Sequence, residues 1–433
     1  MIKEVAMPAS QLLLLGLARR QGQRVGITSV CSAHPEVIGA ALALGKAEGK
    51  AVLIEATCNQ VNHEGGYTGM KPADFRRFVE RIAAKEGFDL EGLILGGDHL
   101  GPNPWKMLPA AAAMDKACAM VADYVAAGFK KIHLDASMPC ADDPSPLPDA
   151  TIATRSARLA AVAEKHATGA ALVYVIGTEV PIPGGALEAV AHLAVTSAAA
   201  ARATVDIHRA AFAGEGIGAA FARVIGLVVQ PGVEFRNENV LAYVPAAAQS
   251  LVAALDTLPL VFEAHSTDYQ TPQALSALVR DGFAILKVGP GLTFTLREAL
   301  YGLDHIADLM FPPRPETLRA AMERVMLNAP KHWASYYPGT PAHQQLQRHF
   351  SYSDRIRYYW TEPDAAQAVA ALLAQFGDIP IPVPLISQHL GAAGSDVMQG
   401  AVAPTAKALL RSAVTRILTQ YSAACGHLPP GSR

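Results

Sequence analysis

The sequence predicts a (β/α)8 barrel, and three observations support this fold class. Eight short runs of apolar, often β-branched residues recur along the chain, and each ends in Asp, Glu, His, Gln or Lys. The runs are continuously apolar, as in buried parallel strands, and too short for buried helices. Ala- and Leu-rich segments separate the runs, which gives the strand–helix alternation of a barrel. The predicted strands lie within residues 24–34, 51–60, 93–102, 131–137, 172–180, 224–234, 260–268 and 284–291.

The segments between the predicted strands are expected to form the outer helices. Residues 103–128 contain AAAAMDKACAMVADYVAAG, and Ala, Leu and Val also recur at helical spacing in 185–213. Gly128 is expected to cap the first of these helices. The Pro-rich stretch 139–148 directly follows the fourth strand, so it is predicted to be an active-site loop rather than a domain boundary.

The remainder of the chain is longer than a plain barrel needs. The chain has 433 residues, against ~250 for a typical barrel, and the excess falls mainly after residue 300. We expect a barrel domain at 1–300 and a helical extension at 301–433 packed on it. Helices are predicted up to about residue 330 and again at 363–376. The aromatic stretch between them should fold back on the barrel, either as a lid or as an interface.

Composition excludes several classes of protein. The net charge is −2 and no basic run occurs, which argues against a nucleic-acid partner. The longest apolar run near the start, Leu12 to Leu15, is too short for a membrane span or a signal peptide. Five cysteines without a CxxC pair favour reduced thiols and a cytoplasmic protein. Because barrels commonly associate, base rates favour a homo-oligomer.

Polar residues at strand ends are expected to share the catalytic rim of the barrel. Asp98 and His99 follow the third strand, Glu179 follows the fifth, and His265 follows the seventh. Two imidazoles and a carboxylate from separate strands would make an open site for a divalent metal. His99, His265 and Glu179 are therefore the predicted metal ligands.

Other polar residues in or after the strands are candidates for either a structural role or a role in the site. Glu55 and Asp135 are either ion-paired residues that hold loops or members of the site, Glu55 as a catalytic carboxylate and Asp135 as a substrate ligand. Asn59 is a further candidate for binding substrate. A lone His inside a strand is usually structural, so His133 is expected to be structural.

Phosphate binding is expected without a nucleotide. The segment GGYTGMK (65–71) superficially resembles a P-loop but lacks its terminal Gly-Lys-Ser/Thr. Barrels tend to bind phosphate with the loops after strands seven and eight. Arg355 and Arg357 could add bidentate contacts if the extension covers this rim, and otherwise form a solvated or interface pair. The candidate substrate and phosphate residues in those two loops are Ser266, Thr267, Asp268, Lys287, Gly289 and Gly291.

Ten motifs follow one another over nearly the whole chain: GITSVCSAHP, VLIEATCNQVN, GGYTGM, LGGDHLGPN, KIHLDASM, YVIGTEVPIPGG, VVQPGVEF, EAHSTDYQT, AILKVGP and SDRIRYYW. Together they resemble one known family, the non-catalytic subunit of class II D-tagatose-bisphosphate aldolase. This family has also been labelled tagatose 6-phosphate kinase, and some members are D-tagatose 6-phosphate 4-epimerases. The resemblance implies a phosphorylated ketohexose substrate in tagatose or galactitol catabolism.

Of the activities that the resemblance implies, the 4-epimerase is our first hypothesis. The second is a non-catalytic subunit that stabilises a separate tagatose-1,6-bisphosphate aldolase, although such a subunit would have no use for the acidic and histidine residues at one rim. The third, a kinase, is disfavoured because no Walker A motif is present.

The chain is also similar, more distantly, to the catalytic class II aldolases. That likeness implies Asp98 as acid/base, His99 and His265 as metal ligands, and Glu179 or Gln230 in place of a third His. The metal, Zn²⁺ or alternatively Mn²⁺, would polarise the C2 carbonyl while Asp98 or Glu179 takes the C4 hydroxyl proton. Breaking the C3–C4 bond and rejoining it after the aldehyde half turns would invert C4.

Overall fold

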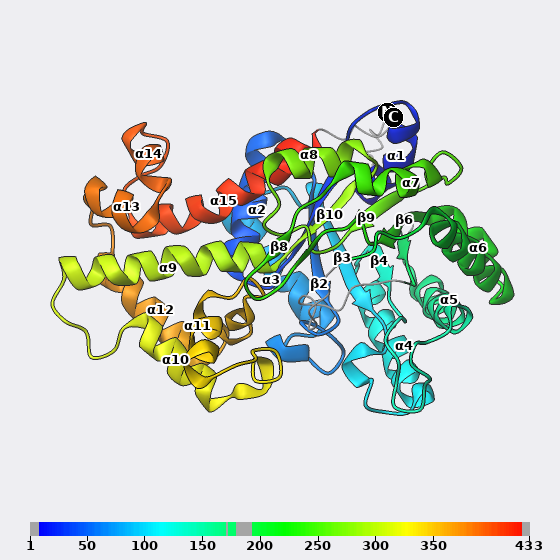
Figure 1. Ribbon diagram of the computed structural model, residues 1–433, viewed down its shortest axis with the longest axis horizontal. Helices are drawn as coiled ribbons and strands as arrows, with labels where there is room; N and C mark the ends of the chain where they lie inside the picture. Colours follow the sequence, from blue (N-terminus) through cyan, green and yellow to red (C-terminus); the bar gives the residue numbers. More distant parts are fainter. Residues whose placement is uncertain (1–7, 170–171, 179–192, 427–433) are drawn as a thin grey trace.

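The computed structural model describes residues 8–169, 172–178 and 193–426 of the chain, and its centre is a closed barrel (Figure 1). Eight parallel strands pair in the order β1-β2-β3-β4-β5-β6-β9-β10, and β10 closes the ring on β1. The predicted (β/α)8 fold is confirmed, and every strand falls in its predicted segment. The barrel strands are β1 (Ile27–Cys31), β2 (Val52–Thr57), β3 (Leu93–Leu100), β4 (Lys131–Leu134), β5 (Val173–Ile176), β6 (Val224–Val229), β9 (Val261–Ala264) and β10 (Ile285–Val288).

Helices follow the strands and form the outer layer (Figure 1). Several of these helices have Pro in the first turn, where the missing N–H costs nothing. The Ser197 side chain caps the helix that begins at Ala198, and the Thr271 side chain caps the helix that begins at Pro272. A short hairpin of β7 (Glu234–Phe235) and β8 (Val240–Leu241) interrupts the alternation after β6. The outer helices are α2 (Pro35–Glu48), α3 (Pro72–Glu86), α4 (Ala110–Ala126), α5 (Asp149–His166), α6 (Ala198–Gly214), α7 (Pro245–Ala254) and α8 (Pro272–Arg280).

A helix before the first strand, α1 (Pro8–Arg20), closes the amino-terminal end of the barrel. Leu12 and Leu15 are fully buried there, in one cluster with residues from the beginnings of the strands, such as Leu53 and Val173. The apolar run near the start of the chain is thus a plug for the barrel, and the opposite end remains for the polar rim. In the described part of the chain, no helix combines the length and the hydrophobicity that a bilayer crossing requires.

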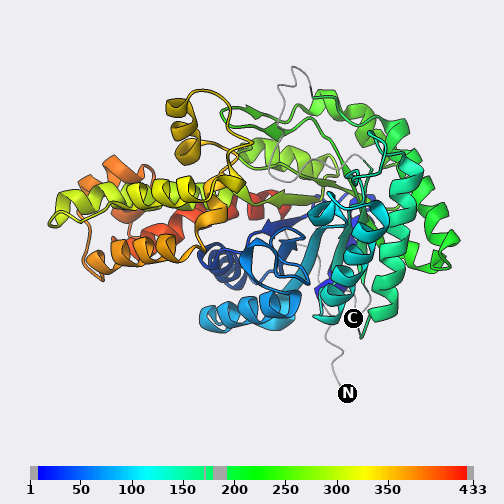
Figure 2. The ribbon, with the colours of Figure 1, turned by 90° about the horizontal axis from the view of Figure 1, so that it is seen from below.

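The extension begins inside a continuous helix and returns to the barrel. The predicted domain boundary at residue 300 lies within α9 (Pro290–Met310), which extends away from the barrel (Figures 1 and 2). The segments predicted to be helical contain α10 (Leu318–Asn328) and α12 (Pro363–Phe376). The other elements are α11 (Pro341–Phe350), the 3-10 turn η6 (Arg355–Tyr359), α13 (Val383–Leu390), α14 (Ala393–Met398) and α15 (Ala406–Cys425).

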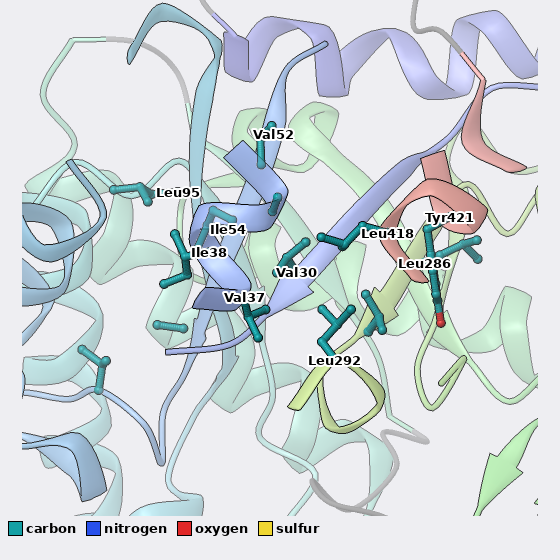
Figure 3. Close-up of a cluster of buried hydrophobic side chains, with 14 of the residues drawn as sticks. Val30, Val37, Ile38, Val52, Ile54, Leu95, Leu286, Leu292, Leu418 and Tyr421 are labelled. Carbon is teal, nitrogen blue, oxygen red and sulfur yellow. The ribbon is translucent and has the colours of Figure 1, made fainter. Parts of the chain in front are cut away.

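The last helix, α15, packs against α2, α8 and β1 and so completes the outer layer of the barrel. Its Leu418 and Tyr421 lie in the same buried cluster as Val30 of β1 and Val37 of α2 (Figure 3). Burying a Leu side chain stabilises a fold by roughly 1.5–3 kcal/mol. The extension and the barrel therefore share one hydrophobic core.

Candidate active site

The polar residues inside the barrel follow from the alternation of strand side chains. Successive side chains of a strand point to opposite faces, so residues two apart share the inner face. Lys131, His133 and Asp135 have this spacing at β4, as do Glu263 and His265 at β9, and all are buried. This spacing of polar residues is the sequence signal that could have placed His133 in the site.

Three histidines and one aspartate converge at the carboxyl end of the barrel. Asp98, His99, His133 and His265 each offer one ligand atom, and these atoms all lie within 4.8 Å of one another. The ring centroids of His99 and His265 are 4.9 Å apart, and that of His133 lies 5.0 Å from His99 and 5.2 Å from His265. His133, which we expected to be structural, is thus a candidate ligand because it faces the same interior point.

One ring nitrogen of each of these imidazoles forms a hydrogen bond with a carboxylate. A carboxylate in that position fixes the tautomer and the orientation of a metal-binding His. The unused nitrogens are then Nε2 of His99, Nε2 of His133 and Nδ1 of His265. The contacts join His99 Nδ1 to Asp135 Oδ2 at 2.7 Å, His133 Nδ1 to Asp98 Oδ1 at 2.8 Å, and His265 Nε2 to Glu263 Oε1 at 3.0 Å.

The cluster fits a divalent metal ion. His133 Nε2 is buried and has no hydrogen-bond partner, which a buried polar atom rarely tolerates. Imidazole nitrogens together with a carboxylate oxygen are suitable ligands for metals such as Zn²⁺. His99 and the neighbouring Ser266 also have positive φ angles, 49° and 53°, a conformation that non-glycine residues seldom adopt and that is common at functional sites. A bound metal would satisfy the orphaned nitrogen.

Charges around the cluster set the protonation of its members. Burial, followed by the positive charge of Lys287, lowers the pKa of His265 to about 3, so this imidazole is neutral and can donate a lone pair. Burial alone would raise the pKa of Asp135, but the hydrogen bond and charge of His99 overcome burial and lower it to about 2. Asp135 is therefore ionised and accepts the His99 N–H.

A layer of alternating charges lies beneath the cluster. Lys131 Nζ is 2.6 Å from Glu55 Oε1 and 2.7 Å from Glu263 Oε2, and neither Lys131 nor the two glutamates is exposed. Lys287 Nζ lies 2.8 Å from Glu55 Oε2 and also contacts Asp98 Oδ1. Burial opposes the charge on Lys287, but Asp98 and the other nearby acids hold the pKa of Lys287 well above its usual value. Glu55, a predicted catalytic carboxylate, is thus an ion-pair partner of both lysines.

A cavity opens above this layer and collects most of the predicted site residues. Residues that we did not predict also border it, among them Cys31, Tyr67 and Tyr358. Tyr67 comes from the loop after β2 and Tyr358 from η6, and their rings pack 4.8 Å apart. The extension therefore covers the rim. The predicted residues that line the cavity are Asn59, Asp98, His99, His265, Ser266, Asp268, Lys287, Gly289 and Arg357.

Four predicted substrate residues do not border the cavity. One of them, Asp135, instead holds His99 Nδ1. The Thr267 hydroxyl donates to Lys287 O at 2.6 Å, and the Gly291 amide donates to Asp268 Oδ1 at 2.7 Å. Arg355 donates its Nε to a backbone carbonyl, and its guanidinium lies over the Tyr336 ring instead of in the cavity.

Glu179 and Gln230 are the two predicted candidates for a third metal ligand in place of His. Glu179 lies outside the described residues. Gln230 Oε1 accepts the backbone amides of Gly232 at 2.8 Å and Val233 at 3.0 Å, so it holds a turn and is not one of the clustered donors. Within the described residues, His133 is the third imidazole of the cluster.

The P-loop-like segment does not form a phosphate cradle. The amides of Gly65, Gly66, Tyr67, Thr68 and Met70 all donate to acceptors within the same loop, including Asn62 Oδ1 and Asn59 O. A P-loop instead presents its backbone N–H groups to the phosphates. These amides are therefore not arranged as in a P-loop.

Comparisons with known proteins place the chain among sugar-phosphate enzymes. A family model described as "D-tagatose-1,6-bisphosphate aldolase subunit GatZ/KbaZ-like" matches residues 12–426. A protein from Agrobacterium fabrum named D-tagatose 6-phosphate 4-epimerase is 57% identical over 419 residues, which cover 95% of this chain and 97% of that protein. The crystal structure of a probable tagatose 6 phosphate kinase from Sinorhizobium meliloti has a TM-score of 0.87 and 58% identity, covering 92% of this chain and 100% of that one.

Proposed function

We propose that this chain, which belongs to the GatZ/KbaZ-like family of D-tagatose-1,6-bisphosphate aldolase subunits, is a metal-dependent D-tagatose 6-phosphate 4-epimerase. The observation that carries the proposal is the convergence of three carboxylate-bound imidazoles with Asp98, in a cluster whose His99 and His265 line the same cavity as Lys287. The name of the 57% identical relative supports the choice of reaction.

His99, His133 and His265 would hold the metal, and we favour Zn²⁺ because imidazole is its usual nitrogen ligand. When bound, such an ion polarises the C2 carbonyl of the ketose and so eases loss of the electron pair from the C3–C4 bond. Asp135, Asp98 and Glu263 keep the three imidazoles in place. The metal's identity can be tested by elemental analysis of the purified protein.

Asp98 and Lys287 would manage the proton and the charge of the reaction. Asp98 takes the C4 hydroxyl proton as the C3–C4 bond breaks, and the bond's electron pair moves into an ene-diolate across C2 and C3. The Lys287 ammonium, which contacts Asp98 and borders the cavity, stabilises the negative charge that develops. The aldehyde half turns, its other face is attacked by C3, and Asp98 returns the proton to the new C4 hydroxyl.

The kinase named in the crystallographic relative is a weaker candidate for this chain. A kinase needs a phosphate cradle for its nucleotide, whereas the amides of the 65–70 loop are used internally. The other candidate is a subunit that stabilises a separate catalytic aldolase, as the family description suggests. A purely stabilising subunit gives no reason for an orphaned imidazole nitrogen in a cluster of possible metal ligands.

The test is incubation of the purified protein with D-tagatose 6-phosphate, with added Zn²⁺ or Mn²⁺ and with a chelator. Fructose 6-phosphate and triose phosphate are followed in separate coupled assays. We expect fructose 6-phosphate without triose phosphate, loss of activity with the chelator, and at least a hundredfold loss in His133→Ala. Absence of turnover under all metal conditions, together with stabilisation of a catalytic aldolase, would refute the epimerase in favour of the stabilising subunit.

A further inference from the structure

The loops after β9 and β10 contain an anion position that the protein fills itself. Asp268 is 3% exposed, and its Oδ1 accepts the amides of Gly289 at 3.0 Å and Gly291 at 2.7 Å. These amides belong to the cap and first turn of α9, a helix of 21 residues. In barrels, this region and a helix amino terminus are the usual place for a substrate phosphate.

Glycine at position 291 leaves room for this arrangement. A Cβ there would lie 3.1 Å from Asp268 Oδ1, closer than such contacts normally are. A phosphate oxygen could reach the same amides only by displacing the carboxylate, and it would meet the negative charge of Asp268 in a site with little water. The loop position that sequence reasoning assigned to phosphate is therefore closed to a second anion.

A different part of the cavity offers a positive charge that has no ion-pair partner among the described residues. Arg357 lines the cavity, and its guanidinium donates to Asp354 O at 3.0 Å, to Tyr358 Oη at 3.0 Å and to Ser353 O. The Asp354 carboxylate acts on Arg357 through its charge, but it lies within ion-pair distance of Arg297 instead, at 3.8 Å from Nε. An arginine held by carbonyls and a hydroxyl is ready to bind phosphate.

We propose that Asp268 selects a ketohexose with a single phosphate, because its carboxylate stands where a phosphate on C1 would bind, while Arg357 takes the phosphate on C6. The assignment of C1 rests on the proposed function, in which the C2 carbonyl is held at the imidazole cluster. Asp268 is three residues after His265 in the same loop and borders the same cavity. We therefore place it beside C1, the chain-end carbon next to C2. Its carboxylate accepts a hydrogen bond from the C1 hydroxyl and repels a C1 phosphate.

The experiment measures binding of two open-chain ligands that lack a carbonyl and cannot react, D-glucitol 6-phosphate and D-glucitol 1,6-bisphosphate. Dissociation constants are determined by calorimetry for the wild-type protein, Asp268→Asn and Arg357→Met. Asn keeps an oxygen for the two amides but removes the charge. We expect the wild-type protein to prefer the monophosphate by at least about tenfold and Asp268→Asn to reduce this preference by about tenfold.

Controls separate this inference from general charge effects and from the proposed reaction. Asp281→Asn removes the same charge from a carboxylate that bonds the Tyr243 hydroxyl outside the cavity, and it should leave the preference unchanged. Arg357→Met should weaken the binding of both ligands. An unchanged preference in Asp268→Asn, or wild-type binding of the bisphosphate as tight as that of the monophosphate, would overturn the inference. Because these ligands do not react, the result is independent of whether the protein is an epimerase.

Discussion

Replacing Asp135 by Asn tests whether the carboxylate–imidazole pairs build the metal site. Asp135 Oδ2 lies 2.7 Å from His99 Nδ1, while Oδ1 accepts the Ser137 amide at 3.1 Å and its hydroxyl at 2.6 Å. Asn can keep the oxygen that serves Ser137, but its NH₂ group would then face His99 Nδ1. An amide can only donate there, so the His99 proton is driven to Nε2, the nitrogen that would bind the metal.

The expected magnitude follows from the loss of this one support. Removing such an outer partner lowers metal affinity by about 10–100-fold, which corresponds to about 1.4–2.7 kcal/mol. Zn²⁺ affinity is measured by competition with a chromophoric chelator, and circular dichroism and urea unfolding of the metal-free protein check that the fold is retained. Ser137→Ala is the matched control, because it removes a bond to the same carboxylate without changing the tautomer of His99. Affinity of Asp135→Asn within twofold of the wild-type value would refute the reasoning.

Two further predictions concern stability. Lys131→Met removes the closer of two cations that Glu55 and Glu263 share and leaves them Lys287, at 2.8 Å and 3.6 Å. We therefore expect a loss of about 3 kcal/mol in the free energy of unfolding, the lower end of the cost of breaking a buried ion pair. Lys130→Met is the control: it changes the neighbouring lysine, whose exposed side chain donates to Thr168 O, and should change the free energy of unfolding by no more than about 0.5 kcal/mol. Equal losses for the two variants in urea titrations would contradict the buried-pair argument. Burial, which outweighs the bond to Thr204 O, lowers the pKa of His208 from 6.5 to about 4. Its stabilising contribution is complete above pH 6.5 and is lost as pH falls toward 4, because only the unfolded state takes up the proton in this window. We expect the wild-type protein to lose about 2 kcal/mol from this group between pH 7 and pH 5, and His208→Gln to lose correspondingly less. Identical pH profiles of the two proteins would show that His208 is not responsible.

The strands could be predicted because their signal is local. Each run of apolar residues ends where the chain leaves the barrel, so Asp98, His99 and His265 were found at the rim from their sequence positions alone. His133 is expected to be structural when it is considered as a single His in an apolar strand. Considered together with Lys131 and Asp135 at spacings of two, it belongs to an inward-facing polar row, which makes it a candidate ligand.

Other features depend on contacts that the sequence pattern does not contain. Arg355 and Arg357 are two residues apart in one short turn, yet only Arg357 borders the cavity, and Arg355 lies over Tyr336. Asp268 was predicted to bind substrate, but its bonds to two amides in another loop depend on how β9 and β10 pair. Such partners are fixed by the tertiary structure.

The return of α15 to the barrel has a consequence for biosynthesis. The surface formed by α2, α8 and β1 is made early or midway through translation, but the helix that covers it ends at Cys425. Domains usually fold as units as they emerge from the ribosome. In this protein an apolar strip of the nascent barrel stays uncovered until the residues of α15 have been synthesised. A chain cut short within the last helix would therefore have an open seam in its barrel, even though every strand and every donor of the imidazole cluster had already been made.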